Sequence, residues 1–250
     1  MKKLIITIAC MSGIAAFAQD GFFLQPEMGA GNAIIKDGYP VGINPGYYAD
    51  RMSPVKNVFS YRANVLAGYK SGHWSMTTGI SFLRTGYHED NLELSTGGWY
   101  GYWNYKVTQY YYHLSVPFTA AYEIKAGRRF SVSPAMGVAM SYNVSSSQTM
   151  DLTNFQVTNP DEKHTLTNSE FNKQYHRISG WGILKVQAEY RLSERVTIIC
   201  GPEAQCMLTS FQKHSDVNAT RNHAYTFNAG VTWHLKKKTN IETKSNNPTN

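Results

Sequence analysis

The chain has 250 residues and a formal net charge of +7, with 16% charged and 13% aromatic residues, and Tyr is the commonest aromatic type. The positive charge is mild for this length and is not gathered into a basic helix or an Arg-rich stripe, so we expect no nucleic-acid partner. Low charge with abundant Tyr and Gly favours extended structure at an interface and argues against a helical soluble enzyme.

The first residues predict a secretory signal peptide over residues 1–18. They combine a basic start at Lys2 and Lys3 with a long apolar run, and the small-x-small triplet AFA precedes Gln19. Cys10 lies within this run, but the residues before it fit a lipidation site poorly. Later in the chain there is no stretch of the roughly 18 consecutive apolar residues that a spanning helix needs.

From residue 22 onward the sequence alternates apolar and polar residues with period two and shows no sustained helical period. The alternation predicts eight strands, near residues 22–31, 58–70, 74–86, 107–125, 130–143, 177–191, 195–209 and 223–235. The connections between them alternate: long at 34–57, 87–106, 144–176 and 210–222, and short at 71–73, 126–128 and 192–194. An even strand number with long connections at one end and tight turns at the other is the pattern of an outer-membrane barrel.

The two faces of these strands differ in composition. In the last strand, Tyr225, Phe227, Val231 and Trp233 share one face. When the apolar face of each strand is taken as the outer face, the outer positions contain no Asp, Glu, Lys or Arg. A lipid-facing Lys or Arg at mid-bilayer would cost about 2–4 kcal/mol, which explains this absence. The other face is small and neutral. A secreted lipocalin-like barrel with its apolar face around a ligand is the alternative, but its exterior should carry far more charge.

We therefore predict an all-β fold, an eight-stranded antiparallel up-and-down transmembrane β-barrel with long extracellular loops and short periplasmic turns. The barrel occupies residues 19–235, and residues 236–250 form a disordered polar periplasmic tail. The predicted location is the cell outer membrane.

The charges within the strands are predicted to face the lumen in equal numbers of each sign. Eight strands leave an interior just wide enough for side chains, and charges there must be paired and hydrogen-bonded. We predict a plug of ion pairs joined by amides and one His; a proton or solute path is the alternative and needs a wider bore. The predicted lumen network consists of Glu27, Arg62, Asn64, Lys70, His113, Glu123, Lys185, Gln187, Glu189, Arg191, Glu203 and Gln205.

Catalysis and cofactor binding find little support. His113 and Ser115 resemble the His-x-Ser pair that outer-membrane lipid A deacylases carry on a barrel strand, but Val116 stands where that family has Asn. A serine nucleophile also needs an oriented base and an oxyanion site, and the nearest strand carboxylate is Glu123. The His residues are scattered without metal-ligand spacing. We predict no catalytic residues, no metal and no cofactor.

The long connection GGWYGYWNY at residues 97–105 is the candidate surface for ligands. Exposed Trp and Tyr can stack on sugar rings or anchor a protein, and the residues singled out are Trp99, Tyr100, Tyr102 and Trp103. The expected partners are outer-membrane lipids and lipopolysaccharide, the barrel-insertion machinery, and an extracellular protein or glycan at the loops. We expect a monomer.

The stretch YYHLSVPFTAAYEI at residues 111–124 resembles a signature of the PorT-like outer-membrane β-barrel family, in which a strand carries Tyr and then Ile-Pro or Val-Pro followed by apolar residues. Supporting stretches are PAMGVAMSYN, GWGILKVQAEYRL, IICGPEAQCML and FNAGVTWHL. The resemblance implies an eight-stranded barrel of Gram-negative outer membranes, most members having no assigned biochemical role and the namesake being linked to protein secretion. The chain departs from the pattern at Ser115, where Glu is common, and at Leu235, where Phe usually ends the strand.

Overall fold

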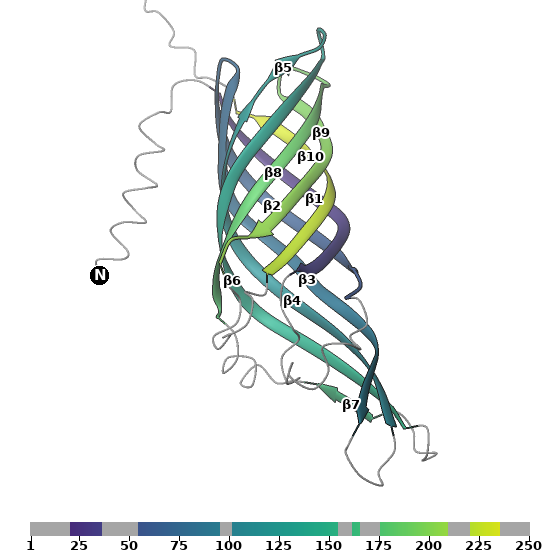
Figure 1. Cartoon of the computed structure of the whole chain (residues 1–250). Coiled ribbons are helices and arrows are strands. Elements are labelled where there is room, and N and C mark those ends of the chain that lie inside the picture. The colour runs from purple at the N-terminus through teal and green to yellow at the C-terminus, as the bar shows by residue number, and fades with distance from the viewer. Residues whose placement is uncertain are drawn as a thin grey trace, which may run out of the picture.

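The computed structural model describes residues 21–36, 55–95, 102–154, 162–165, 176–209 and 221–235. The predicted signal peptide and polar tail lie outside this part of the chain. The described residues form strands β1 (Phe22–Lys36), β2 (Val58–Ser71), β3 (Trp74–Ser95), β4 (Tyr102–Tyr122), β5 (Ile124–Lys125), β6 (Phe130–Asn154), β7 (Glu162–Thr165), β8 (Ile178–Arg191), β9 (Val196–Met207) and β10 (Arg221–His234) (Figure 1). Among the described residues there is no helix that is long and apolar enough to cross a membrane.

The strands close into a barrel. Their order is β4-β3-β2-β1-β10-β9-β8-β6, and β4 pairs with β6 to complete the ring. Every pairing is antiparallel, including β1 with β10, which joins the first and last strands of the chain. β5 continues β4 beyond Glu123, and β7 is a short addition to β6. The predicted closed eight-stranded antiparallel barrel is therefore confirmed.

Alternation along each strand separates lumen from exterior. On β2, Ser60, Arg62 and Asn64 are buried while Phe59 and Val65 are exposed. The same parity holds around the ring, and it places large apolar side chains outside: Met28, Phe59, Val65, Ile80, Val116, Phe118, Met136, Met140, Leu184 and Phe227 are all at least half exposed. An apolar exterior around a polar interior excludes the lipocalin-like alternative, because water would face that exterior in a soluble barrel.

The outward face is not free of charge, contrary to the prediction. Arg84 has the same parity on β3 as Ile80 and Phe82, and its guanidinium carbon lies 3.7 Å from the centroid of the Tyr110 ring. The penalty for a lipid-facing cation falls to about 0–1 kcal/mol near the membrane interface. An Arg near the end of the apolar band is thus tolerated where one at mid-bilayer is not.

β3, β4 and β6 extend well past their predicted limits and β1 runs on to Lys36, so the connections expected at 34–57, 87–106 and 144–176 are wrong in part. β3 runs on to Ser95 and pairs with β4 from Tyr102, and β6 runs on to Asn154. In Figure 1 these strands continue well past the other strands and end close to β7. Beyond the membrane neither face needs to be apolar, so the alternation that marks a strand in the sequence disappears while the pairing persists.

We predict that Val116→Arg destabilises the barrel by about 2–4 kcal/mol. Val116 is 55% exposed on the exterior of β4, near the middle of the apolar band, so the new charge would face hydrocarbon. Urea unfolding of the protein in lipid vesicles measures the loss. Leu192→Arg, in the turn after β8, is the matched control and should cost under about 1 kcal/mol; equal losses would contradict a lipid-facing β4 surface.

Candidate functional site: the closed lumen

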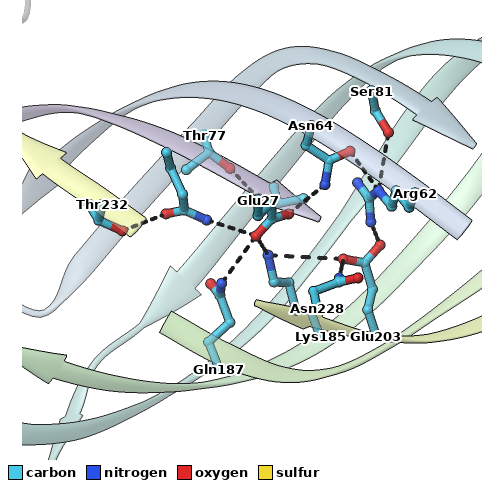
Figure 2. A network of polar contacts seen from close by, with 12 residues as sticks. Glu27, Arg62, Asn64, Thr77, Ser81, Lys185, Gln187, Glu203, Asn228 and Thr232 are labelled. Atoms are coloured by element: carbon cyan, nitrogen blue, oxygen red, sulfur yellow. Dashed lines mark hydrogen bonds and ion pairs between the residues drawn. The ribbon is translucent and has the colours of Figure 1, made fainter. Parts of the chain in front are cut away.

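Four charged side chains from four strands meet inside the barrel (Figure 2). Lys185 of β8 places its Nζ 2.6 Å from Oε2 of Glu27 on β1 and 3.9 Å from Oε2 of Glu203 on β9. Arg62 of β2 pairs with the other oxygen of Glu203. Each of the four residues is at most 6% exposed, so two cations and two carboxylates neutralise one another away from water. We call these four residues the central cluster.

Amide side chains add hydrogen bonds to the two carboxylates of the central cluster. Asn64 donates to Oε1 of Glu27 at 2.6 Å and accepts from Arg62 Nε at 2.7 Å. The further donors to the two carboxylates are Gln25 and Gln187 on Glu27, at 3.2 and 3.5 Å, and Gln205 and Asn228 on Glu203, at 2.6 and 2.8 Å. Buried charges are tolerated when their remaining lone pairs are satisfied in this way. Gln25 and Asn228 were not among the predicted residues, although the parity of their strands places both inside.

The remaining predicted charges form a separate group at the end of the barrel that carries the short turns. Lys70 Nζ lies 3.1 Å from Oε2 of Glu123 and 4.0 Å from Oε2 of Glu189, and Arg191 lies 4.0 Å from Glu123. The Arg191 side chain is 52% exposed. These residues line a pocket at the barrel mouth together with basic residues of the nearby turns. The pair made by Arg191 is solvent-exposed and contributes little to stability, whereas Lys70 and Glu123 are 21% and 4% exposed. The structure thus divides the predicted network into a dry central cluster and a second group that reaches water at Arg191.

A layer of apolar side chains fills the lumen on the other side of the central cluster, toward the long connections. Its largest members, Leu83, Tyr111, Trp181 and Met207, are each 1% exposed. Trp181 donates its indole N–H to Ser179 Oγ at 3.0 Å. Sequence reasoning missed this apolar layer, although all four residues have the inward parity of their strands. The lumen is therefore blocked twice, by charge pairs and by packed apolar groups.

His113 belongs to the apolar layer and not to the ion pairs. Its ring meets the Trp181 ring edge-on at 5.4 Å, and its Nε2 lies 3.1 Å from the Thr85 hydroxyl. Ser115 Oγ is hydrogen-bonded to Ser141 Oγ at 2.8 Å. The two residues that suggested a catalytic pair are thus each engaged by a different partner, and the nearest predicted carboxylate, Glu123, holds Lys70 at the barrel mouth.

The candidate surface aromatics can be placed only in part. Trp99 and Tyr100 lie outside the described residues, whereas Tyr102 and Trp103 belong to β4 and pair with Ser95 and Leu94. Across the described ranges no group of three or more His, Cys, Asp or Glu side chains is arranged to hold a metal ion.

A closed sheet with an apolar exterior satisfies all of its backbone hydrogen bonds internally, which is the requirement for crossing lipid with strands. The protein is an integral outer-membrane β-barrel. No protein-family model matches the chain, and no curated protein matches it either.

Solved outer-membrane barrels give structural matches of low similarity. Neisserial surface protein A has 13% identity and a TM-score of 0.42 over 86% of this chain and 97% of its own. A major outer membrane protein from Thermus thermophilus has 11% identity and a TM-score of 0.42 over 86% and 99%. The outer membrane protease OmpT from Escherichia coli has 7% identity and a TM-score of 0.36 over 87% and 98%. Matches this distant assign neither a family nor an activity to this chain.

We predict that Lys185→Met destabilises the folded barrel by about 3–5 kcal/mol, because it leaves Glu27 without its closest cation in a dry site. Pairing the change with Glu27→Gln, which removes the orphaned charge, should recover much of the loss. Urea unfolding in vesicles, followed by Trp fluorescence, measures both variants.

Arg191→Gln provides the control for this experiment, since it removes a half-exposed cation at the barrel mouth. Its expected cost is under about 1 kcal/mol. A Lys185→Met variant as stable as Arg191→Gln would show that the central cluster does not hold the barrel together.

Proposed function

We propose that this protein is a non-enzymatic outer-membrane barrel with a structural or surface-interaction role, and that it moves no solute through its lumen. The observation that supports this proposal is the double closure of the interior. The central cluster joins β1, β2, β8 and β9 by direct ion pairs. The apolar layer around Trp181 covers the side of the cluster that faces the long connections. Eight strands leave no space for a channel beside side chains of this size.

A proton or solute path would require polar groups in a continuous line from one mouth to the other. Charged groups do run from Lys70 at the short-turn end to the central cluster. Beyond that cluster, Leu83, Tyr111 and Trp181 occupy the lumen with 1% exposure each. An apolar layer of this kind interrupts a water column, and His113 within it is hydrogen-bonded to the Thr85 hydroxyl and not to a charge of the central cluster.

The surface role is supported by the strands that extend beyond the end of the barrel. β3, β4 and β6 stay paired well beyond the apolar band, with β7 added to β6, so a sheet projects from the end that carries the long connections (Figure 1). The aromatic stretch containing Trp99, Tyr100, Tyr102 and Trp103 lies between β3 and β4 or at the start of β4. We propose this projection as the place where an extracellular protein or glycan binds. The membrane side of the protein would contact lipid and lipopolysaccharide, as a monomer delivered by its signal peptide and the insertion machinery.

Participation in protein secretion is the second candidate function, and it rests on the PorT-like resemblance of residues 111–124. Pro117 and the apolar residues around it form part of β4, between β3 and β6. If the protein is such an accessory, deleting it leaves normally exported enzymes in the periplasm. Unchanged export in the deletion strain contradicts this candidate and leaves the structural role standing.

A lipid A-modifying enzyme is the third candidate, and the geometry gives it no support. His113 and Ser115 face the lumen with 0% and 7% exposure, whereas a lipid substrate would approach from outside. The Ser141 hydroxyl also occupies the hydrogen-bonding position at Ser115 that a general base would need.

We predict that the purified protein in planar bilayers passes no steady current. Lys185→Met combined with Glu27→Gln should also remain closed, because the apolar layer is intact, while adding Trp181→Ala to that pair should produce measurable conductance. A large steady current through the unmodified protein would contradict the closed lumen. A closed triple variant would show that the Trp181 layer is not the second barrier.

A further inference from the structure

Arg84 is a cation on the lipid-facing side of β3. The outward row of this strand runs through Trp74, Met76, Ile80 and Phe82 before it reaches Arg84. The neighbouring outward residues on β2 and β4 are aromatic: Phe59 and Tyr61 on β2, and Tyr110 and Tyr112 on β4. Arg84 therefore lies within an aromatic belt that spans three strands.

The rings around Arg84 hold its guanidinium group against the barrel. Its central carbon lies 3.7 Å from the Tyr110 ring centroid and 5.4 Å from that of Tyr61. The belt continues sideways through Tyr61 and Phe82, 6.1 Å apart, and through Phe82 and Tyr112, which stack at 6.2 Å. Contacts with ring faces stabilise the cation but use none of its N–H donors.

The hydrogen-bonding capacity of Arg84 is left open within the described part of the chain. Its Nε is buried and has no acceptor there, and no described carboxylate pairs with it. The nearest acidic residue with a described side chain along β3, Glu89, has the opposite parity and is 2% exposed inside the barrel. Because Nε is covered, a ligand would have to reach the two terminal amino groups of the guanidinium, whose donors match two oxygens of a phosphate or carboxylate.

The height of Arg84 matches that of a lipid headgroup. Trp74, at the short-turn end of β3, is 59% exposed and packs on Tyr122 with ring centroids 5.0 Å apart, as expected of one aromatic girdle. Ten residues separate Trp74 from Arg84, which is about 33 Å along a strand at ~3.3 Å per residue and about 25 Å of height at a tilt of ~40°. The apolar band of outer-membrane barrels is also about 25 Å tall. Arg84 thus lies at the opposite interface, on the side of the long connections.

The surface beyond Arg84 carries His88 and Lys106. The next outward position on β3 is Gly86, a buried residue paired with Tyr110, which has no side chain of its own to separate Arg84 from His88. His88 Nδ1 is hydrogen-bonded to the Thr108 hydroxyl at 2.7 Å, and the exposed Lys106 follows on β4. The positive charge of Lys106 lies above Arg84, and Asp90 in the outward row of β3 and Asp151 opposite Lys106 come only after His88 and Lys106.

We propose that Arg84, framed by Tyr61 and Tyr110, is a binding site for the phosphate of an anionic glycolipid in the leaflet on the side of the long connections. The guanidinium donates to the phosphate oxygens, and the tyrosine rings pack on its faces and on the adjoining sugar. The acyl chains then lie along Phe82, Ile80 and Val65, which are outward and apolar. The site rests on the proposed lipopolysaccharide contact of the barrel but not on the proposed closure of the lumen, because it lies on the other face of the sheet.

The test uses the full-length barrel in nanodiscs of phosphatidylcholine containing a small fraction of lipid A. Native mass spectrometry after transfer to detergent counts the glycolipid that stays bound. Retention of bisphosphorylated lipid A should exceed that of the dephosphorylated form roughly tenfold, as expected when a charge-assisted contact is lost. This comparison needs no variant, and equal retention of the two lipids would overturn the proposal.

Arg84→Gln should reduce retention of the bisphosphorylated lipid by a similar, roughly tenfold factor. Arg128→Gln changes the same charge in the exposed turn at the opposite end of the barrel, and it should leave retention within about twofold. Heat-dependent migration in detergent gels verifies that both variants are folded. If the folded Arg84→Gln protein retains as much lipid as the Arg128→Gln protein, Arg84 is not the binding site.

Discussion

The pairing of β4 with β6 is the constraint on which the rest of the structure depends. It gives every strand of the ring two partners, so that backbone donors and acceptors are satisfied where lipid offers none. Closure also fixes the two faces of the sheet. One face must be apolar because it meets lipid, and the other encloses a space that only side chains can fill.

The central cluster opposes a shift in strand register that apolar alternation alone does not oppose. A strand that slips by two residues keeps all of its side chains on the correct face, so apolar patterning does not oppose such a slip. The slip does move a side chain by about 6.6 Å along the strand. Lys185 would then lose the 2.6 Å contact to Glu27, and two carboxylates would be left in a dry lumen. The ion pairs therefore favour one stagger of the strands over its near neighbours.

Period-two alternation was sufficient to predict the strand number, the closed architecture and which side chains point inward. It could not predict which inward charges meet, because Glu27 and Lys185 are 158 positions apart and their height in the barrel depends on the stagger between strands. The extensions of β3, β4 and β6 were missed because a sheet in water needs no apolar face. Arg84 was missed because the rule against outward charge weakens near the membrane interface.

The positions of the central-cluster residues along the chain bear on how the barrel assembles. Glu27 lies on the first strand, and its partners on β8 and β9 come near the end of the chain. Hairpins such as β2 with β3 and β8 with β9 can form locally, but the pairing of β1 with β10 must await the last strand to be synthesised. Asn64 and Arg62 of the neighbouring β2 can reach Glu27 early, but the contact with Lys185 needs β8 in place beside them. We expect insertion into the bilayer and completion of the ring to be coupled for this chain, because only the closed ring shields these charges from hydrocarbon.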